Sequence, residues 1–263
     1  MNRVRWIAAA AAVVTLVACA TSPMGRRQLL LMPGAQMDQM GMTAYAQLKG
    51  QTPLSTNQQQ INYVRCINNA LTGTLDGKQQ WEINLFEDPS ANAFALPGGF
   101  MGVHSGLLQV ARNQHQLAAV IGHEIGHVMA QHSNERVSIE FATSTGMQLL
   151  QAMAGEQSEQ KQMLFGLLGV GSQVGISLPF SRKHETEADL IGLELMARAG
   201  FDPHEAVTLW QNMAQAAGGN ASPEFLSTHP SGSTRIRELT NQLPKVMPLY
   251  EQARAAGKNP ACR

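Results

Sequence analysis

The chain has 263 residues, of which 44% are hydrophobic and 14% are charged. A chain of this length and composition can bury enough apolar surface to form a stable globule, which excludes an intrinsically disordered protein. Lys plus Arg and Asp plus Glu both total 19, so the formal net charge of zero provides no general attraction to a polyanion, and we expect no nucleic-acid partner.

The first segment has the pattern of a secretory signal. Two arginines precede an apolar run, residues 6–17, which is shorter than the roughly 20 residues of a membrane-spanning helix. We therefore expect residues 1–18 to be a signal peptide. Residues 16–19 read Leu-Val-Ala-Cys and resemble a bacterial lipobox, which implies that Cys19 is lipidated and begins the mature chain. Ala20, in place of aspartate, implies an outer-membrane anchor facing the periplasm. The alternative is an ordinary signal peptide cut elsewhere.

Composition divides the mature chain into a tether, one domain and a tail. Residues 19–54 are rich in Gln, Met, Pro and Gly, and we expect a lipid-anchored tether that becomes helical near residues 36–48. The folded domain is placed at residues 55–245 and a C-terminal tail at residues 246–263.

Hydrophobic periodicity predicts the main elements of the domain. Apolar residues at helical spacing indicate buried helices, alternation indicates a half-buried strand, and two further short strands flank the turn at residues 97–99. Helices and strands in this proportion predict an α+β, helix-dominated fold. The expected helices cover residues 61–71, 117–128 and 185–199, and the expected strands cover residues 81–85, 93–96 and 100–103.

Two other segments allow more than one interpretation. Residues 138–180 mix polar stretches with apolar runs, and we interpret them as a helical hairpin whose apolar face is core; the alternative is a lid that contacts a membrane or gates substrate. Cys66 and Cys262 would lie in an oxidising compartment after export, where they can form a disulfide. Two free thiols are the alternative.

The residues His123-Glu124-Ile125-Gly126-His127 carry the clearest chemical signal. Two imidazoles four residues apart project from one face of a helix, one turn apart, where both can bind a tetrahedral Zn²⁺. Glu124 would then lie beside the water on the metal. The alternative is two surface histidines on an ordinary helix.

A catalytic zinc needs a third protein ligand. On a continuous helix His132 lies about 180° around from His123 and cannot reach the same metal. Glu185 and Asp189 are four residues apart and share a helical face. Glu187 points about 200° away from Glu185 on the same helix. We therefore expect that replacing Glu187 leaves zinc binding intact. We predict Glu185 as ligand and Asp189 as the carboxylate that orients a zinc-bound imidazole. Without the HExxH motif, residues 181–189 would be interpreted as a solvated charged face of a helix.

These motifs, followed by Thr228-His229-Pro230 with Arg235, resemble the M48 metallopeptidase family, and most of all its soluble, lipid-anchored bacterial branch related to the mitochondrial Oma1 peptidase. The resemblance implies a zincin-like fold of the gluzincin type with an HExxH active-site helix. It also implies one Zn²⁺ per chain, bound by His123, His127 and Glu185, with Glu124 as general base and Asp189 in the catalytic set. Residues 138–180 lack the length and apolarity of the helices found in the membrane-spanning branches of this family.

The resemblance assigns two more features. It implies that Asn92-Ala93-Phe94-Ala95-Leu96 is an edge strand that pairs with extended substrate. It also implies that His229 faces the active site, where it either stabilises the oxyanion or occupies the open zinc position in a resting state. A plain turn residue before Pro230 is the alternative for His229.

The motifs thus predict a zinc endopeptidase, and the family resemblance implies that it hydrolyses misfolded or unassembled envelope proteins. The alternatives are a zinc-stabilised chaperone or assembly factor with little turnover, and a structural lipoprotein with a vestigial site. Glu124 separates these functions, because a general base is required for hydrolysis but not for a structural zinc.

Overall fold

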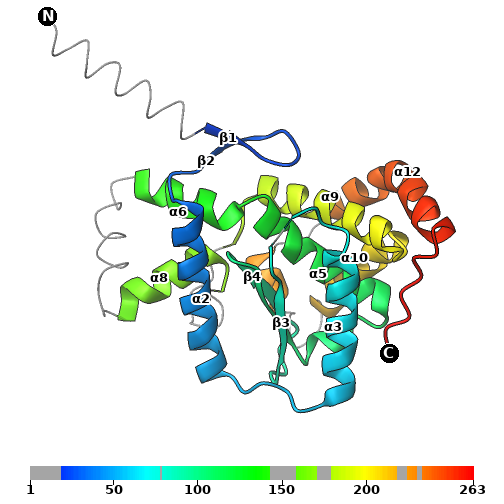
Figure 1. Cartoon of the computed structure of the whole chain (residues 1–263), viewed down its shortest axis with the longest axis horizontal. Helices are drawn as coiled ribbons and strands as arrows, with labels where there is room; N and C mark the ends of the chain where they lie inside the picture. The colour runs from blue at the N-terminus through cyan, green and yellow to red at the C-terminus, as the bar shows by residue number, and fades with distance from the viewer. Residues whose placement is uncertain (1–18, 78, 143–157, 171–178, 218–223, 230–232) are drawn as a thin grey trace, which may run out of the picture.

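The computed structural model describes residues 19–77, 79–142, 158–170, 179–217, 224–229 and 233–263. The predicted signal peptide, residues 1–18, lies outside them. Helices dominate the described residues and surround one small sheet (Figure 1). This confirms the helix-dominated α+β class predicted from the sequence.

The sheet contains the three strands that the sequence predicts. Strands β3 (Glu82–Phe86), β5 (Phe100–His104) and β4 (Ala93–Leu96) lie in that spatial order, with β3 parallel and β4 antiparallel to β5. The turn between β4 and β5 contains Gly98 and Gly99 at φ of 85° and 81°, a left-handed conformation that favours glycine. Because β4 is last in the strand order and pairs only with β5 among the described strands, it is an edge strand of this sheet.

Helix α5 (Gln114–Met129) is the central element and carries the HExxH motif. The Asn113 side chain caps its first turn by accepting hydrogen bonds from the backbone N–H groups of His115 and Gln116. Every residue from Gln116 to His127 is buried, because other elements cover this helix all round. Helix α3 (Gln58–Thr72) packs nearby and buries Val64, Ile67 and Leu71 on one stripe, as the periodicity predicts.

Helix α9 (Arg182–Ala199) crosses α5 at very short range. The contact is made through small residues: a Cβ on Gly126 would lie 2.7 Å from the carbonyl oxygen of Ala188, and one on Gly122 would lie 3.1 Å from that of Gly192. No larger side chain fits between the two backbones without moving one helix. Helix α9 ends at Gly200, whose φ of 85° suits glycine.

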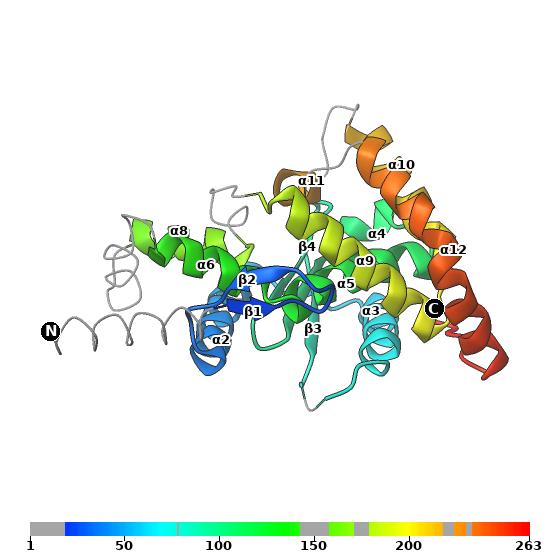
Figure 2. The same cartoon turned by 90° about the horizontal axis from the view of Figure 1, so that it is seen from above.

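The remaining helices lie on two sides of this pair (Figure 1, Figure 2). Helices α10 and α12 lie on one side, and α6 and α8 on the other. The tail predicted from residue 246 is not separate, because α12 continues across that boundary and a disulfide joins Cys262 to Cys66 on α3. The four helices just named are α6 (His132–Ala142), α8 (Ser158–Leu168), α10 (His204–Ala217) and α12 (Ser233–Ala255). The described residues also form two short helices, α4 (Leu107–Val110) and α11 (Phe225–Thr228).

The segment expected to be a tether is folded onto the domain. Strands β1 (Cys19–Thr21) and β2 (Arg27–Leu29) pair antiparallel, and helix α2 (Gly34–Gln51) follows them. Helix α2 includes the helical stretch predicted at residues 36–48. It packs against the sheet through Tyr45, whose hydroxyl donates to the carbonyl of Met101. The tether interpretation missed these contacts, because the buried side chains of α2 are few and separated by polar residues.

The predicted hairpin at residues 138–180 is described only in part. Helices α6 and α8 pack against one another, and Leu164, Phe165, Leu167 and Leu168 are buried, which agrees with an apolar face in the core. Residues 143–157 and 171–178 lie outside the described part of the chain. Among the helices that are described, none has the length and hydropathy to span a membrane.

Candidate metal centre

Four potential ligand atoms converge at the crossing of α5 and α9. One nitrogen or oxygen atom each from His123, His127, Glu185 and His229 lies within 4.8 Å of the others, and all four side chains are buried. The Nε2 atoms of His123 and His127 lie 3.0 Å apart. They lie 3.5 and 3.4 Å from the carboxylate oxygens of Glu185, so the three groups can face one ion.

The protonation of these groups suits a metal site. Burial lowers the pKa of His123 and lowers that of His127 further, so both imidazoles are neutral and keep a lone pair. Burial disfavours ionisation of Glu185, but the nearby His229 and Arg235 outweigh it and hold the pKa of this carboxyl well below its usual range. Two neutral imidazoles and one carboxylate form a donor set that binds zinc in proteins.

Glu124 lies next to this cluster, and only one of its two oxygens accepts a hydrogen bond from a described residue. Its Oε2 accepts a hydrogen bond of 3.0 Å from the backbone N–H of Ala95 on β4. Its Oε1 is buried and has no hydrogen-bond partner among the described residues, although His229 Nε2 lies 3.4 Å away. Burial raises the pKa of Glu124 to about 7, so this carboxyl can exchange a proton near neutral pH.

His229 lies in the site, directly after α11. Its Nδ1 is 3.1 Å from Glu185 Oε1 and 3.2 Å from His123 Nε2. The ring stacks on Phe225 at a centroid distance of 4.3 Å. Burial alone would lower the pKa of His229, but the carboxylates of Glu185 and Glu124 raise it above its ordinary value. The plain-turn alternative does not account for this buried position.

Arg235 on α12 is a site residue to which the sequence assigned no role. Its Nη1 donates to Glu185 Oε2 at 2.8 Å and its Nη2 donates to Asp189 Oδ1 at 2.6 Å, while the guanidinium lies 3.4 Å from the centre of the Trp210 ring. Asp189 Oδ1 in turn lies 2.8 Å from His123 Nδ1. Arg235 thus binds both the candidate ligand Glu185 and Asp189, the carboxylate that contacts His123. Only its place in the family motif could have indicated it.

His132 lies closer to the site than the sequence predicted. The helix does not continue past α5: Gln131 has a φ of 50°, and α6 begins at His132. Because of this break, His132 Nδ1 lies 2.9 Å from His127 Nδ1. The angle of about 180° for a continuous helix therefore does not apply to His132. This residue contacts the Nδ1 side of His127 but is not among the four groups that can face one ion.

Glu187 does point away from Glu185, but into protein and not into solvent. The side chain is buried, and its Oε2 accepts a hydrogen bond of 2.8 Å from Arg26 Nε and lies 3.1 Å from His132 Nε2. The alternative of a solvated charged face does not apply to this segment, because the chain before residue 55 folds over this side of α9. Arg26 was not a candidate in the sequence analysis.

The predicted substrate strand lies beside the candidate base. Among the described strands, β4 pairs only with β5, and its N–H at Ala95 is directed to Glu124. Asn92 and the four residues of β4 are buried in this structure. A cavity of about 260 Å³ lies at the end of the strand and is lined by Pro97 and Gly98, by Met37 of α2, and by His127.

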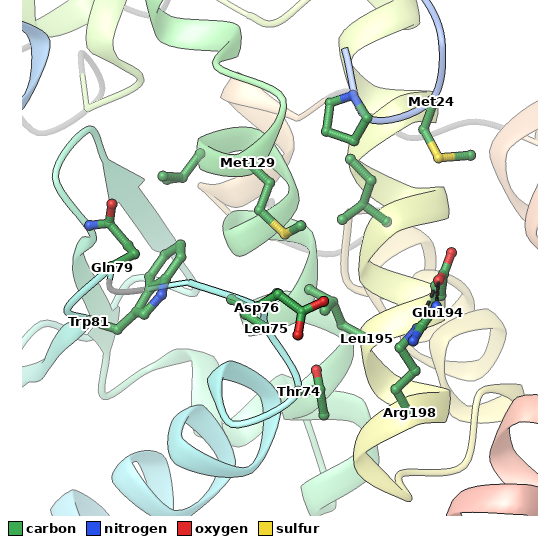
Figure 3. A pocket seen from close by; sticks show the side chains of 13 residues that line it. Met24, Thr74, Leu75, Asp76, Gln79, Trp81, Met129, Glu194, Leu195 and Arg198 are labelled. Atoms are coloured by element: carbon green, nitrogen blue, oxygen red, sulfur yellow. Dashed lines mark hydrogen bonds and ion pairs between the residues drawn. The ribbon is translucent and has the colours of Figure 1, made fainter. Parts of the chain in front are cut away.

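A second cavity lies away from the ligand cluster. Its volume is about 450 Å³, and Met24 of the β1–β2 turn, Trp81 and Met129 line it (Figure 3). Its ionisable side chains are Asp76, Glu194 and Arg198, of which the last two pair with one another at 2.6 Å. It contains none of the candidate ligands, so it is not the metal centre.

Comparison with known proteins agrees with this geometry. Residues 58–243 match the model of Peptidase family M48. The chain belongs to this family. The four clustered residues all lie inside the matched segment, and the site that they form can hold a metal ion.

Several curated M48 relatives are similar over most of this chain. The mitochondrial metalloendopeptidase OMA1 of Schizosaccharomyces pombe is 42% identical over 179 residues, which are 67% of this chain and 50% of the relative. The beta-barrel assembly-enhancing protease of Escherichia coli strain K12 is 31% identical over 224 residues, which are 82% of this chain and 45% of the relative. The chain therefore spans about half the length of these relatives.

Proposed function

We propose that this chain is a zinc-dependent endopeptidase whose ligands are His123, His127 and Glu185. The observation that carries the proposal is the buried cluster of these three groups, beside which Oε1 of Glu124 accepts no hydrogen bond from a described residue. When bound, zinc supplies Lewis acidity that makes water nucleophilic near neutral pH and polarises the scissile carbonyl.

The side chains of the site divide the remaining work. Glu124 accepts the proton of the attacking water and, with a pKa of about 7, can return it to the leaving amine. Asp189 and Arg235 orient the imidazole of His123. His229, whose pKa is raised by the facing carboxylates, donates a hydrogen bond to the developing oxyanion.

Substrate binds as an added strand along Asn92-Ala93-Phe94-Ala95-Leu96. Support comes from the edge position of β4 and from the hydrogen bond between the Ala95 N–H and Glu124. This hydrogen bond shows that β4 lies next to the proposed base, so a substrate backbone bound along β4 would lie there too. Recognition through backbone hydrogen bonds requires an extended chain and little side-chain specificity. Unfolded or misfolded proteins satisfy this requirement.

The clients we propose are misfolded or unassembled envelope proteins. Residues 1–18 act as signal peptide, and Cys19 carries the lipid that anchors the chain to the outer membrane, facing the periplasm. Support comes from the lipobox and from the similarity to a protease whose name refers to beta-barrel assembly. Cys19→Ser should move the protein from the membrane fraction to the soluble fraction. Unchanged membrane association would contradict the anchor.

The experiment that tests the activity uses unfolded casein as substrate. The wild-type protein should cleave it, a chelator should stop cleavage, and added Zn²⁺ should restore it. Glu124→Gln should keep its zinc, measured by mass spectrometry of the native protein, and lose more than about 100-fold in rate, because the amide keeps the shape and loses the base. Full activity in Glu124→Gln would refute the mechanism.

A second function, a zinc-stabilised chaperone or assembly factor, gives a different result in the same assay. The name of the Escherichia coli relative, which refers to assembly as well as to proteolysis, is the reason to consider it. A chaperone should suppress casein aggregation equally well in the wild type and in Glu124→Gln, without fragments in either sample. Fragments formed only by the wild type exclude this alternative.

A further inference from the structure

A second polar cluster, buried except for its partly exposed arginine, lies behind His127, on the side away from the other candidate ligands. It consists of Arg26, His132, Glu135 and Glu187, and we call it the Arg26 cluster. The guanidinium of Arg26 binds both carboxylates: Nε donates to Glu187 Oε2 at 2.8 Å, and Nη1 and Nη2 donate to the two oxygens of Glu135 at 2.7 and 2.6 Å. His132 then connects Glu187 to His127.

The contacts of this cluster allow only one direction of hydrogen bonding. Nε2 of His127 faces His123 and Glu185, so a metal bound there leaves the single proton of the neutral imidazole on Nδ1. That N–H can donate to His132 Nδ1, 2.9 Å away, only if Nδ1 of His132 carries no proton. His132 must then carry its proton on Nε2, where it donates to Glu187 at 3.1 Å.

The two metal-binding histidines therefore have matching supports. Asp189, held by Arg235, contacts Nδ1 of His123 directly. Glu187, held by Arg26, reaches Nδ1 of His127 through the ring of His132. Both carboxylates come from α9, and they point to opposite sides of it because they are two residues apart.

Arg26 differs from the rest of the cluster in its origin. It belongs to the β1–β2 turn, 161 residues before Glu187 and 109 residues before Glu135 in the chain. A second residue of this hairpin, Gln28, donates to the carbonyl of Ala130 at the break between α5 and α6. The hairpin thus contacts both the carboxylate of Glu187 and the backbone of Ala130 near His127. Figure 2 shows β1 and β2 lying over the region where α5, α6 and α9 meet.

We propose that Arg26, Glu187 and His132 are positioning residues that fix the tautomer and orientation of His127, so that the N-terminal hairpin is part of the metal site. The proposal rests on the proposed zinc centre. Outer partners of this kind contribute about 10- to 100-fold in metal affinity. A lysine cannot replace Arg26, because one ammonium cannot hold two carboxylates in the fork geometry of a guanidinium.

The test compares zinc affinity of full-chain variants by competition with a chromophoric chelator. Arg26→Ala, Glu187→Gln and His132→Phe should each bind zinc about 10- to 100-fold more weakly than the wild type. For Glu187 this replaces the expectation of unchanged zinc binding that helical spacing alone gave, because Glu187 reaches His127 through His132. Arg26→Ala combined with His132→Phe should lose no more than His132→Phe alone, because both act through the same chain of hydrogen bonds. The matched control is Arg198→Ala, which removes an arginine from an exposed pair with Glu194 and should bind zinc within about twofold of the wild type.

A spectroscopic measurement separates positioning from mere folding. In the zinc-loaded wild type, ¹⁵N NMR of the histidine rings should show His127 protonated at Nδ1 and slow to exchange, and Arg26→Ala should lose this protection. Wild-type zinc affinity together with an unchanged His127 signal in Arg26→Ala would overturn the proposal, even if that variant melts at a lower temperature.

His123→Ala reports on the metal centre itself. If it loses zinc while Arg26→Ala and His132→Phe do not, the zinc centre stands and the role of the Arg26 cluster is wrong. If His123→Ala binds zinc as tightly as the wild type, the zinc centre is wrong and the positioning role fails with it.

Discussion

His229 shows how one buried side chain can serve or block the same site. Its ring lies between Glu185 and Glu124, close enough to donate to an oxyanion and close enough to occupy a coordination position. We expect the first role to dominate, so His229→Ala should lower the rate of casein cleavage by about 100-fold or more. Zinc affinity, measured in parallel, should change little.

The opposite outcome has a distinct meaning. If His229 only blocks the open metal position, His229→Ala should cleave casein faster than the wild type and degrade itself on storage. Wild-type activity with unchanged zinc binding would instead show that His229 takes no part in turnover. Phe225, which stacks on the ring, offers a control: Phe225→Leu keeps the imidazole and should lose less activity than His229→Ala.

At the scale of elements, the crossing of α5 and α9 sets the distance between the ligands. His127 and Glu185 come from different helices, and Gly126 and Ala188 lie in the contact between them. Gly126→Ala should push the helices apart, lower the free energy of unfolding by about 1–3 kcal/mol and weaken zinc binding. Urea unfolding and chelator competition measure the two effects.

Gly50 supplies the matched control for this substitution. It lies in α2, and a Cβ added there meets no atom within 4 Å. Gly50→Ala should therefore raise the free energy of unfolding by up to about 1 kcal/mol through helix propensity, with no change in zinc affinity. Equal destabilisation by both substitutions would show that the close contact between α5 and α9 is not what limits residue 126.

For the whole molecule, the disulfide between Cys66 and Cys262 joins α3 to the end of the chain across 196 residues. Cys262→Ser should lower the free energy of unfolding by about 2–5 kcal/mol, because the unfolded chain is no longer closed into a loop. Urea unfolding of the oxidised proteins measures this loss. The wild type should also migrate differently on reducing and non-reducing gels, and the variant should not.

The bond can also be tested chemically in the wild type. Under denaturing conditions without reductant, neither Cys66 nor Cys262 should react with an alkylating agent. Alkylation of both would exclude the disulfide, and the stability loss expected for Cys262→Ser would then have no basis. After reduction, wild type and variant should unfold at the same urea concentration, which serves as the control.

The sequence by itself determined the parts of this protein that depend on short-range geometry. The spacing of His123 and His127 places two imidazoles on one face of a helix, and alternation and turn residues mark the strands of the sheet. The four-residue spacing of Glu185 and Asp189 indicated Glu185 as the third candidate ligand, and the order of the motifs identified the family. These inferences hold because helical and strand periodicities are properties of adjacent residues.

Only the tertiary structure decided which residues surround the ligands. Arg26 meets Glu187 across 161 residues, and Arg235 meets Glu185 across 50. The break at Gln131, which turns His132 toward His127, leaves no periodic signal. Local patterns cannot predict such contacts, because whether a charged side chain faces solvent or a partner depends on what folds over it. In this chain the N-terminal hairpin folds over α9, and its Arg26 pairs with the carboxylates of Glu135 and Glu187 as a result.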